Sequence, residues 1–162
     1  MHVVLSLGSN IDKEKNIRFA LTEIQKTFGE LEVSPVYETS SVGFDGPAFY
    51  NLVVGLHSEM KVQRIIDILR EIETQAGRIR GAKSFASRVL DIDVVLFGDA
   101  VLRPELNIPR DEIEKYAYVL KPLADLYPDL VHPISQQTIS EMWQEFESKD
   151  QTVFMAEFPL PE

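Results

Sequence analysis

The segment Arg88–Phe97, RVLDIDVVLF, carries the pattern on which both the fold and the candidate chemistry of this chain depend. Side chains alternate across a β-strand, so Asp91 and Asp93 point to one face while Ile92 and its apolar neighbours point to the other. The strongly apolar flanks predict a central strand of a sheet. Two carboxylates at positions i and i+2 suit one or two hard divalent cations, which keep several of their waters. For the pair alone, a solvated sheet face that carries two acids is the alternative.

The residues before this strand predict alternating strands and helices. Residues 3–7 form an apolar run rich in β-branched side chains, which predicts a buried first strand. Apolar residues then recur at helical spacing in two stretches, which end at Gly29 and Gly77. The expected order is strand 3–7, helix to residue 28, strand 33–38, strand 52–56, helix 62–76 and strand 89–97. This βαββαβ order predicts an α+β fold with a ferredoxin-like core and an antiparallel sheet.

Two local signals refine the sheet. Pro35 predicts that strand 33–38 lies at an edge, because proline cannot donate a ladder hydrogen bond. Gly98-Asp99 predicts a two-residue turn into a short strand over residues 100–102, so an added hairpin is expected.

The C-terminal part gives weaker signals. A Pro-interrupted region is followed by a helix over residues 139–146 around Trp143 and by a tail expected to fray from residue 158. The length of 162 residues predicts one domain. We expect its core over about residues 1–135 and a C-terminal extension over about residues 136–162.

Composition excludes several classes of function. The chain has 16 basic and 26 acidic residues, a net charge of −10, which argues against a nucleic-acid polymer or an anionic membrane as partner. The absence of cysteine excludes a disulfide framework, a thiolate zinc site and a cysteine nucleophile. The N-terminal apolar run is too short for a signal peptide or a membrane span, so a cytoplasmic protein is expected.

A basic segment precedes the carboxylate strand. Residues 77–90 contain Arg78, Arg80, Lys83 and Arg88 and no acid, which leaves 12 basic against 26 acidic residues elsewhere. Arginine forks bind phosphate oxygens bidentately, and cations held by the neighbouring carboxylates bridge them. A solvated surface loop explains the bases alone, but their combination with the acid pair favours a polyphosphate site.

A third candidate feature is aromatic. Phe49-Tyr50-Asn51 opens the predicted strand 52–56, where a planar heterocycle can stack while the Asn51 amide reads its edge. Ordinary core packing of the aromatic rings is the alternative. The chain has neither a P-loop nor a dinucleotide-binding glycine motif.

Taken in order, these motifs resemble those of 6-hydroxymethyl-7,8-dihydropterin pyrophosphokinase, an enzyme family of folate biosynthesis. The resemblance covers about residues 3–133. It rests on residues 7–10 (LGSN), 34–39 (SPVYET), 49–51 (FYN), 73–80, 88–93 (RVLDID), 108–109 and 119–123 (VLKPL).

The resemblance implies transfer of pyrophosphate from ATP to the pterin hydroxymethyl group, with release of AMP. Asp91 and Asp93 would hold two Mg²⁺ and, together with Arg78 and Arg88, would form the catalytic set. The implied ATP-binding residues are Glu73, Arg78, Arg80, Arg88, Ile92 and Arg110. The implied pterin-binding residues are Thr39, Val42, Phe49, Asn51, Phe85 and Tyr118. A monomer that binds ATP and a pterin is expected.

The chain departs from the family pattern at four places, one of which is the segment 40–43, SSVG, which lacks the usual proline. Arg110 stands where the family usually has a histidine, and Tyr116 stands where a basic residue is expected to contact phosphate. The segment 85–87, FAS, replaces a Trp-Gly-Pro. Two alternatives therefore stay open: a pyrophosphokinase for a related heterocyclic alcohol, and a paralogue that binds pterin or nucleotide with weak or no turnover.

Overall fold

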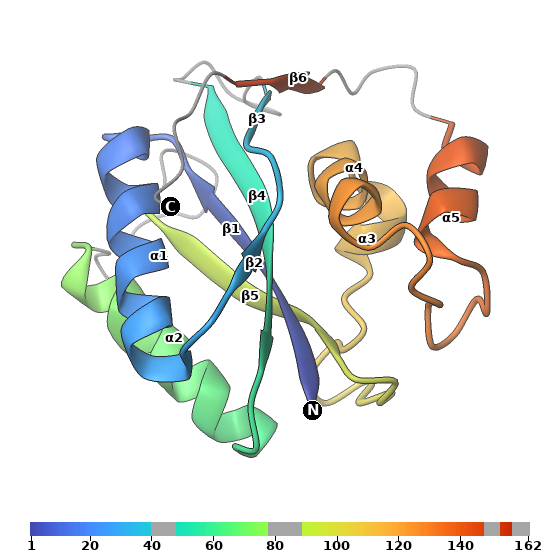
Figure 1. Ribbon diagram of the computed structural model, residues 1–162, viewed down its shortest axis with the longest axis horizontal. Helices are drawn as coiled ribbons and strands as arrows, with labels where there is room; N and C mark the ends of the chain where they lie inside the picture. The colour runs from blue at the N-terminus through green and yellow to red at the C-terminus, as the bar shows by residue number, and fades with distance from the viewer. Residues whose placement is uncertain (40–47, 78–88, 148–152, 157–162) are drawn as a thin grey trace.

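One antiparallel sheet forms the middle layer of the molecule. The computed structural model describes residues 1–39, 48–77, 89–147 and 153–156. The strands run in the order β5-β1-β4-β3-β6, and β2 pairs with β4 outside this order (Figure 1). Their bounds are β1 His2–Ser9, β2 Glu32–Val33, β3 Tyr37–Thr39, β4 Phe49–His57, β5 Asp91–Phe97 and β6 Val153–Met155.

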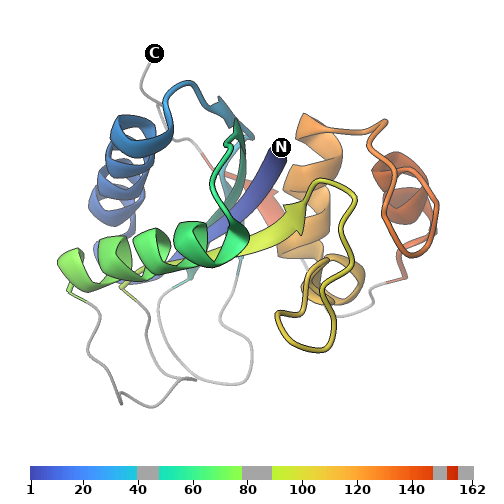
Figure 2. The same ribbon diagram turned by 90° about the horizontal axis from the view of Figure 1, so that it is seen from below.

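Helices cover both faces of this sheet. The helices α1 (Lys13–Phe28) and α2 (Val62–Gln75) lie on one face, and α4 (Ala117–Leu126) lies on the other with α3 (Glu112–Lys115) and α5 (Ile139–Glu145) (Figures 1 and 2). Two apolar cores result, one under α1 and α2 and one under α4 and α5. The element order and the antiparallel pairing confirm the predicted ferredoxin-like α+β core.

The predicted strand 33–38 is two short strands. Ser34 interrupts it, because its N–H donates to the Val53 carbonyl and its hydroxyl accepts the Val53 N–H, each at 2.9 Å. The edge position predicted from Pro35 is correct for β2 but wrong for β3, which lies between β4 and β6. Sequence patterns gave no sign of β6, which pairs with β3 from more than 100 residues away along the chain.

The predicted hairpin after β5 is wrong. Ala100 N–H donates to the Phe97 carbonyl at 3.1 Å in a tight turn, and the chain then leaves the sheet. The outer edge of β5 is instead approached by Arg110, whose backbone N–H donates to the Val95 carbonyl at 3.0 Å. The expectation of a central position is also wrong, because β5 is an edge strand. It is apolar because helices cover both of its faces.

The helix α4 was not predicted, because Pro122 lies inside it. An interior proline costs ~3 kcal/mol or more in helix stability. Burial of Val119, Leu120 and Leu123 against the sheet offsets that penalty, since each such side chain contributes about 1.5–3 kcal/mol.

The C-terminal helix is confirmed. The structure has α5 at Ile139–Glu145, and Thr138 with Glu141 forms a capping box at its start. The predicted fraying of residues 158–162 lies outside the described residues.

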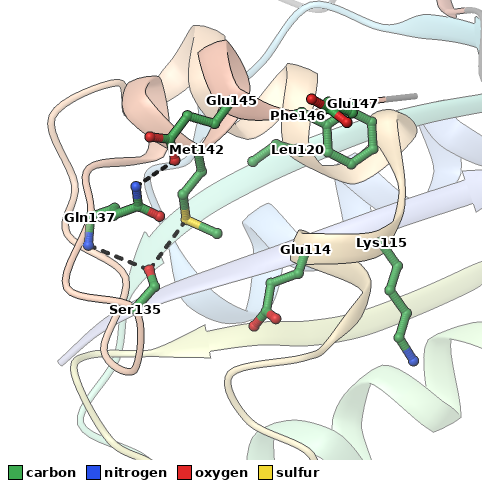
Figure 3. A pocket seen from close by; sticks show the side chains of 9 residues that line it. All are labelled: Glu114, Lys115, Leu120, Ser135, Gln137, Met142, Glu145, Phe146 and Glu147. Atoms are coloured by element: carbon green, nitrogen blue, oxygen red, sulfur yellow. Dashed lines mark hydrogen bonds between the residues drawn. The ribbon is translucent and has the colours of Figure 1, made fainter. Parts of the chain in front are cut away.

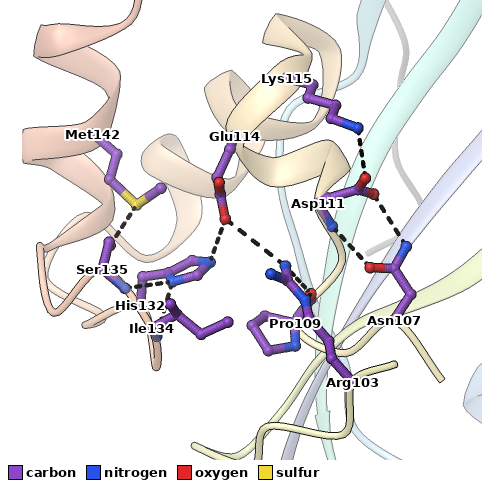
Figure 4. A network of polar contacts seen from close by, with 10 residues as sticks. All are labelled: Arg103, Asn107, Pro109, Asp111, Glu114, Lys115, His132, Ile134, Ser135 and Met142. Carbon is purple, nitrogen blue, oxygen red and sulfur yellow. Dashed lines mark hydrogen bonds and ion pairs between the residues drawn. The ribbon is translucent and has the colours of Figure 1, made fainter. Parts of the chain in front are cut away.

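A buried histidine ties α3 to the segment before α5. His132 is fully buried, and its Nδ1 accepts the N–H groups of Ile134 and Ser135, each at 3.2 Å (Figure 4). Its Nε2 lies 3.6 Å from Glu114 Oε1, and Arg103 Nη2 approaches the same oxygen at 3.8 Å. Burial lowers the pKa of His132; Glu114 acts in the opposite direction and Arg103 in the same one.

This network predicts a pH dependence of stability. Because the pKa of His132 is lower in the folded than in the unfolded state, the folded state binds fewer protons in mild acid. The contribution is fully present above the unfolded histidine pKa of about 6.5 and is lost as the pH falls below it. His132→Asn keeps a side-chain acceptor for the two N–H groups but does not titrate. Urea unfolding at pH 7.5 and 5.5 should show wild type losing stability relative to this variant; a pH-independent difference would contradict the assignment.

Candidate active site

The strand register brings the candidate site residues onto one face of the sheet. Gly8 of β1 pairs with Asn51 on β4 and with Asp91 on β5. Cross-strand partners in an antiparallel sheet share a face, so the Asn51 and Asp91 side chains lie on the same side, separated by one strand. Asp93, paired with Ser6, follows on this face. It is the face that α4 covers farther along the sheet.

The candidate pterin residues cluster at β3 and β4. Asn51 and Thr39 are both 7% exposed, and the Asn51 Nδ2 donates to Thr39 Oγ1 at 3.0 Å. This contact fixes the amide so that its Oδ1 lies toward Gly8, only 3.0 Å from the point that a β-carbon at Gly8 would occupy. Phe49 pairs with Thr39 in the ladder and is half-buried.

Tyr118 belongs to the helical layer that covers this face of the sheet. It lies in the first turn of α4, and its ring stacks on that of Tyr116 with centroids 5.0 Å apart and planes at 19°. The structure thus stacks the predicted pterin-contacting ring on Tyr116, the position at which the resemblance predicts a base.

Two arginines lie beside Asp93, and each is also paired with a glutamate, Arg70 with Glu73 and Arg110 with Glu112. Arg70 Nη2 donates to Asp93 Oδ1 at 3.1 Å, and Arg110 Nη1 lies 4.0 Å from the same oxygen. The repulsion expected between neighbouring strand carboxylates is therefore compensated on the Asp93 side. Burial opposes the charge of Arg110, but Asp93 and Glu112 raise its pKa above the ordinary arginine value.

Two side chains of α2, Glu73 and Arg70, bind the backbone of Ile92 at the outer edge of β5. Glu73 is 1% exposed, and its Oε2 accepts the Ile92 N–H at 2.7 Å. Arg70 Nη1 donates to the Ile92 carbonyl at 2.9 Å and lies 2.8 Å from Glu73 Oε1. Burial opposes the charge of Arg70, but Glu73 and Asp93 together raise its pKa. Glu73 and Ile92, both predicted to bind ATP, thus contact each other directly.

Arg70 is the site residue that sequence reasoning missed. Its signal was its position three residues before Glu73, which puts both side chains on one face of α2. Five predicted residues fall outside the part of the chain that the structure describes: Val42, Arg78, Arg80, Phe85 and Arg88.

One pocket lies apart from this site. It has a volume of about 380 Å³ and opens between α3, α4 and α5, and none of the predicted site residues that the structure describes lines it (Figure 3). Among the described residues, no three His, Cys, Asp or Glu side chains gather closely enough to hold a metal ion by themselves. No helix in the described ranges has the length and hydropathy needed to cross a membrane.

Comparison with known proteins identifies the family. The model of the 7,8-dihydro-6-hydroxymethylpterin-pyrophosphokinase (HPPK) family matches residues 4–128. A 2-amino-4-hydroxy-6-hydroxymethyldihydropteridine pyrophosphokinase of Pseudomonas aeruginosa is 36% identical over 136 residues, which cover 81% of this chain and 83% of that protein. The chain belongs to the HPPK family.

Some of the matched proteins are much longer than this chain. The folic acid synthesis protein fol1 of Schizosaccharomyces pombe is 39% identical over 142 residues, which cover 85% of this chain but only 19% of that protein. The crystal structure of Plasmodium falciparum HPPK-DHPS with pteroate superimposes with a TM-score of 0.72 at 14% identity, covering 90% of this chain and 42% of that one. This second likeness supports the fold.

The close approach of Gly8 to Asn51 makes a testable prediction. Gly8→Ala should destabilise the protein by ~1–3 kcal/mol, because the added methyl meets the Asn51 Oδ1 at 3.0 Å and must displace it. In an Asn51→Ala background the obstructing atom is gone, so the penalty should shrink in a double-mutant cycle measured by urea unfolding. An equal penalty in both backgrounds would place the strain elsewhere.

Proposed function

We propose that this protein transfers pyrophosphate from ATP to the hydroxymethyl group of 6-hydroxymethyl-7,8-dihydropterin and releases AMP. Membership of the HPPK family supports this function. The observation that carries it is the register of β1, which sets Asn51 and Asp91 on either side of Gly8 on one face. A heterocycle held at Asn51 therefore lies one strand away from carboxylates suited to a metal–nucleotide complex.

The donor set fits Mg²⁺. Asp91 and Asp93 supply hard oxygen ligands on one face, and the side chain of Asp93 is 24% exposed, so it is accessible to solvent. Since no third acidic or histidine ligand joins them among the described residues, phosphate oxygens and waters would complete the coordination. Two Mg²⁺ held there would act as Lewis acids and as a template for the triphosphate.

The protein side chains bind and orient the substrates. Asn51 presents its amide to the pterin edge, and Thr39 fixes that amide through the 3.0 Å hydrogen bond. Phe49 and Tyr118 contact the ring faces, which restricts the hydroxymethyl group to one direction. Arg110, with Arg78 and Arg88, binds phosphate oxygens and stabilises the charge that develops on them.

The reaction needs no covalent enzyme intermediate. The hydroxymethyl oxygen forms a bond to the β-phosphorus of ATP while the bond from that phosphorus to the α,β-bridging oxygen breaks. The hydroxyl proton passes to water, and AMP leaves with the bridging oxygen. Positioning and charge neutralisation suffice for such an in-line transfer.

A binding protein with weak turnover is the second candidate. The stacking of Tyr116 on Tyr118 favours it, because an aromatic ring occupies the position at which the family pattern has a base. Retention of both Asp91 and Asp93 favours the enzyme, since a protein that only binds has no need of the metal acids.

Release of AMP distinguishes the two candidates. With ATP, Mg²⁺ and the hydroxymethyl-dihydropterin, the wild-type protein should release AMP at a rate that Asp93→Asn reduces ~100-fold or more, since it removes a metal carboxylate. Asp99→Asn is the matched control, because Asp99 is exposed in the turn after β5 and the same charge is removed there. If the wild-type protein binds the pterin but releases no more AMP than Asp93→Asn does, the pyrophosphokinase function is rejected and the binding function is favoured.

Arg110 gives a separate prediction for nucleotide binding. Its Nε and Nη2 are ion-paired with Glu112, while its Nη1 lies 4.0 Å from Asp93 Oδ1, so Nη1 is placed to meet a phosphate bound at the same metal. Arg110→Ala should weaken the binding of a non-hydrolysable ATP analogue with Mg²⁺ about tenfold or more, the value of a charge-assisted hydrogen bond. Calorimetry would measure this, with Arg18→Ala on the surface of α1 as control. If the affinity of the Arg110→Ala protein equals that of wild type, Arg110 has no phosphate role.

A further inference from the structure

Asp93 already has two cationic neighbours on one oxygen. Oδ1 accepts a hydrogen bond from Arg70 at 3.1 Å, and Arg110 Nη1 lies 4.0 Å from it. Arg110 is also ion-paired with Glu112, so the local charge is mixed, but a divalent cation that binds Oδ1 must still displace the donor of Arg70 and lie near the guanidinium of Arg110. Like charges at such distances repel, and partial burial weakens the screening by water.

The hydrogen bond between Arg70 and Asp93 can break while the other contacts of the Arg70 side chain remain. Nη1 is held by the Ile92 carbonyl at 2.9 Å and by Glu73 at 2.8 Å, while Nη2 donates to Asp93. Glu73 is itself fixed, since it is buried and accepts the Ile92 N–H. Arg70 can therefore release Asp93 and keep its place at the edge of β5. Its side chain is 44% exposed, so the released donor faces solvent.

We propose that Arg70 is a displaceable counter-ion of Asp93, which weakens metal binding to the nucleotide-free protein and makes that binding depend on the nucleotide. The inference rests on the proposed function. Arg70 competes with the cation for Oδ1, whereas the phosphates of a bound nucleotide neutralise both the cation and the guanidinium. Arg70 is a positioning residue, because it acts through Asp93.

Binding of Mn²⁺ in the absence of nucleotide tests the competition. Electron paramagnetic resonance counts free Mn²⁺ during titration of wild type, Arg70→Gln and Arg64→Gln, the last removing the same charge from the exposed face of α2. Arg70→Gln should bind Mn²⁺ roughly threefold more tightly than wild type, the scale of a partly exposed ion pair. Arg64→Gln should match wild type, and Asp93→Asn should lose this binding.

Addition of a non-hydrolysable ATP analogue tests the coupling. The analogue should increase the Mn²⁺ affinity of the wild type and of Arg70→Gln. The increase should be smaller for Arg70→Gln, because the counter-ion of Asp93 is already gone in that variant. An equal Mn²⁺ affinity of Arg70→Gln and Arg64→Gln without nucleotide would overturn the proposal. Unchanged Mn²⁺ binding in Asp93→Asn would overturn it as well.

Two further arms keep the test decisive. Should Arg70→Gln unfold, the Arg70 side-chain N–H resonances of the wild-type protein should shift on titration with Mg²⁺; no shift at saturating Mg²⁺ would overturn the proposal. The Mn²⁺ titration needs neither pterin nor turnover. The proposed function fails if no AMP is released, whereas the counter-ion proposal fails if Mn²⁺ affinity is unchanged in Arg70→Gln. The two failures are therefore distinguishable.

Discussion

The hydrogen bond from the Ile92 N–H to the buried Glu73 carboxylate, 2.7 Å long, is the contact on which the candidate site most depends. In the part of the chain that the structure describes, Ile92 lies on an edge strand, and no strand pairs with its outward N–H and carbonyl. A buried donor left unsatisfied costs about 1–3 kcal/mol, and an unpaired buried carboxylate costs more. Glu73 and Arg70 satisfy both backbone groups from α2, which holds the strand segment carrying Asp91 and Asp93 at a fixed distance from that helix.

The antiparallel register then relates two sites that are far apart in sequence. Asn51 and Asp91 belong to different strand–helix units, yet each pairs with Gly8. A slip of one residue in either pairing would turn one of the two side chains to the opposite face. The small size of Gly8 matters here, because Asn51 Oδ1 occupies the space of a side chain at that position. Relative placement of the two sites is thus a property of the sheet.

The sequence allowed the core order and the acid pair to be predicted because both depend on local periodicity. Apolar spacing located α1 and α2, and the alternation in β5 put Asp91 and Asp93 on one face. Local patterns carry no information on which segment lies beside a strand in space. That is why β5 was expected in the middle of the sheet, and why Arg110, which approaches its edge, was not anticipated there.

The same limit explains why neither the role of Arg70 nor the helix α4 was predicted from the sequence. Arg70 is an ordinary surface arginine by helix position, and its importance comes from contacts with Ile92 and Asp93, more than 20 residues away. The helix α4 contains a proline whose local penalty is offset only by packing against β4, which is also non-local.

The charged groups close to Asp93 matter more for the site than the net charge of the whole chain. The chain carries −10 overall, yet the oxygen of Asp93 has two guanidiniums within 4.0 Å. At physiological salt, charges more than about 8 Å away are largely screened. The potential that a nucleotide meets is therefore set by these two guanidiniums together with the carboxylates paired with them, those of Asp93, Glu73 and Glu112. Position 110 illustrates the consequence. A histidine there, with an ordinary pKa of about 6.5, would be mostly neutral above pH 7. Arg110 keeps its charge throughout that range, since Asp93 and Glu112 raise a pKa that is already high. Where the resemblance to the family leads us to expect a histidine, this chain therefore carries a permanent cation beside the candidate metal site.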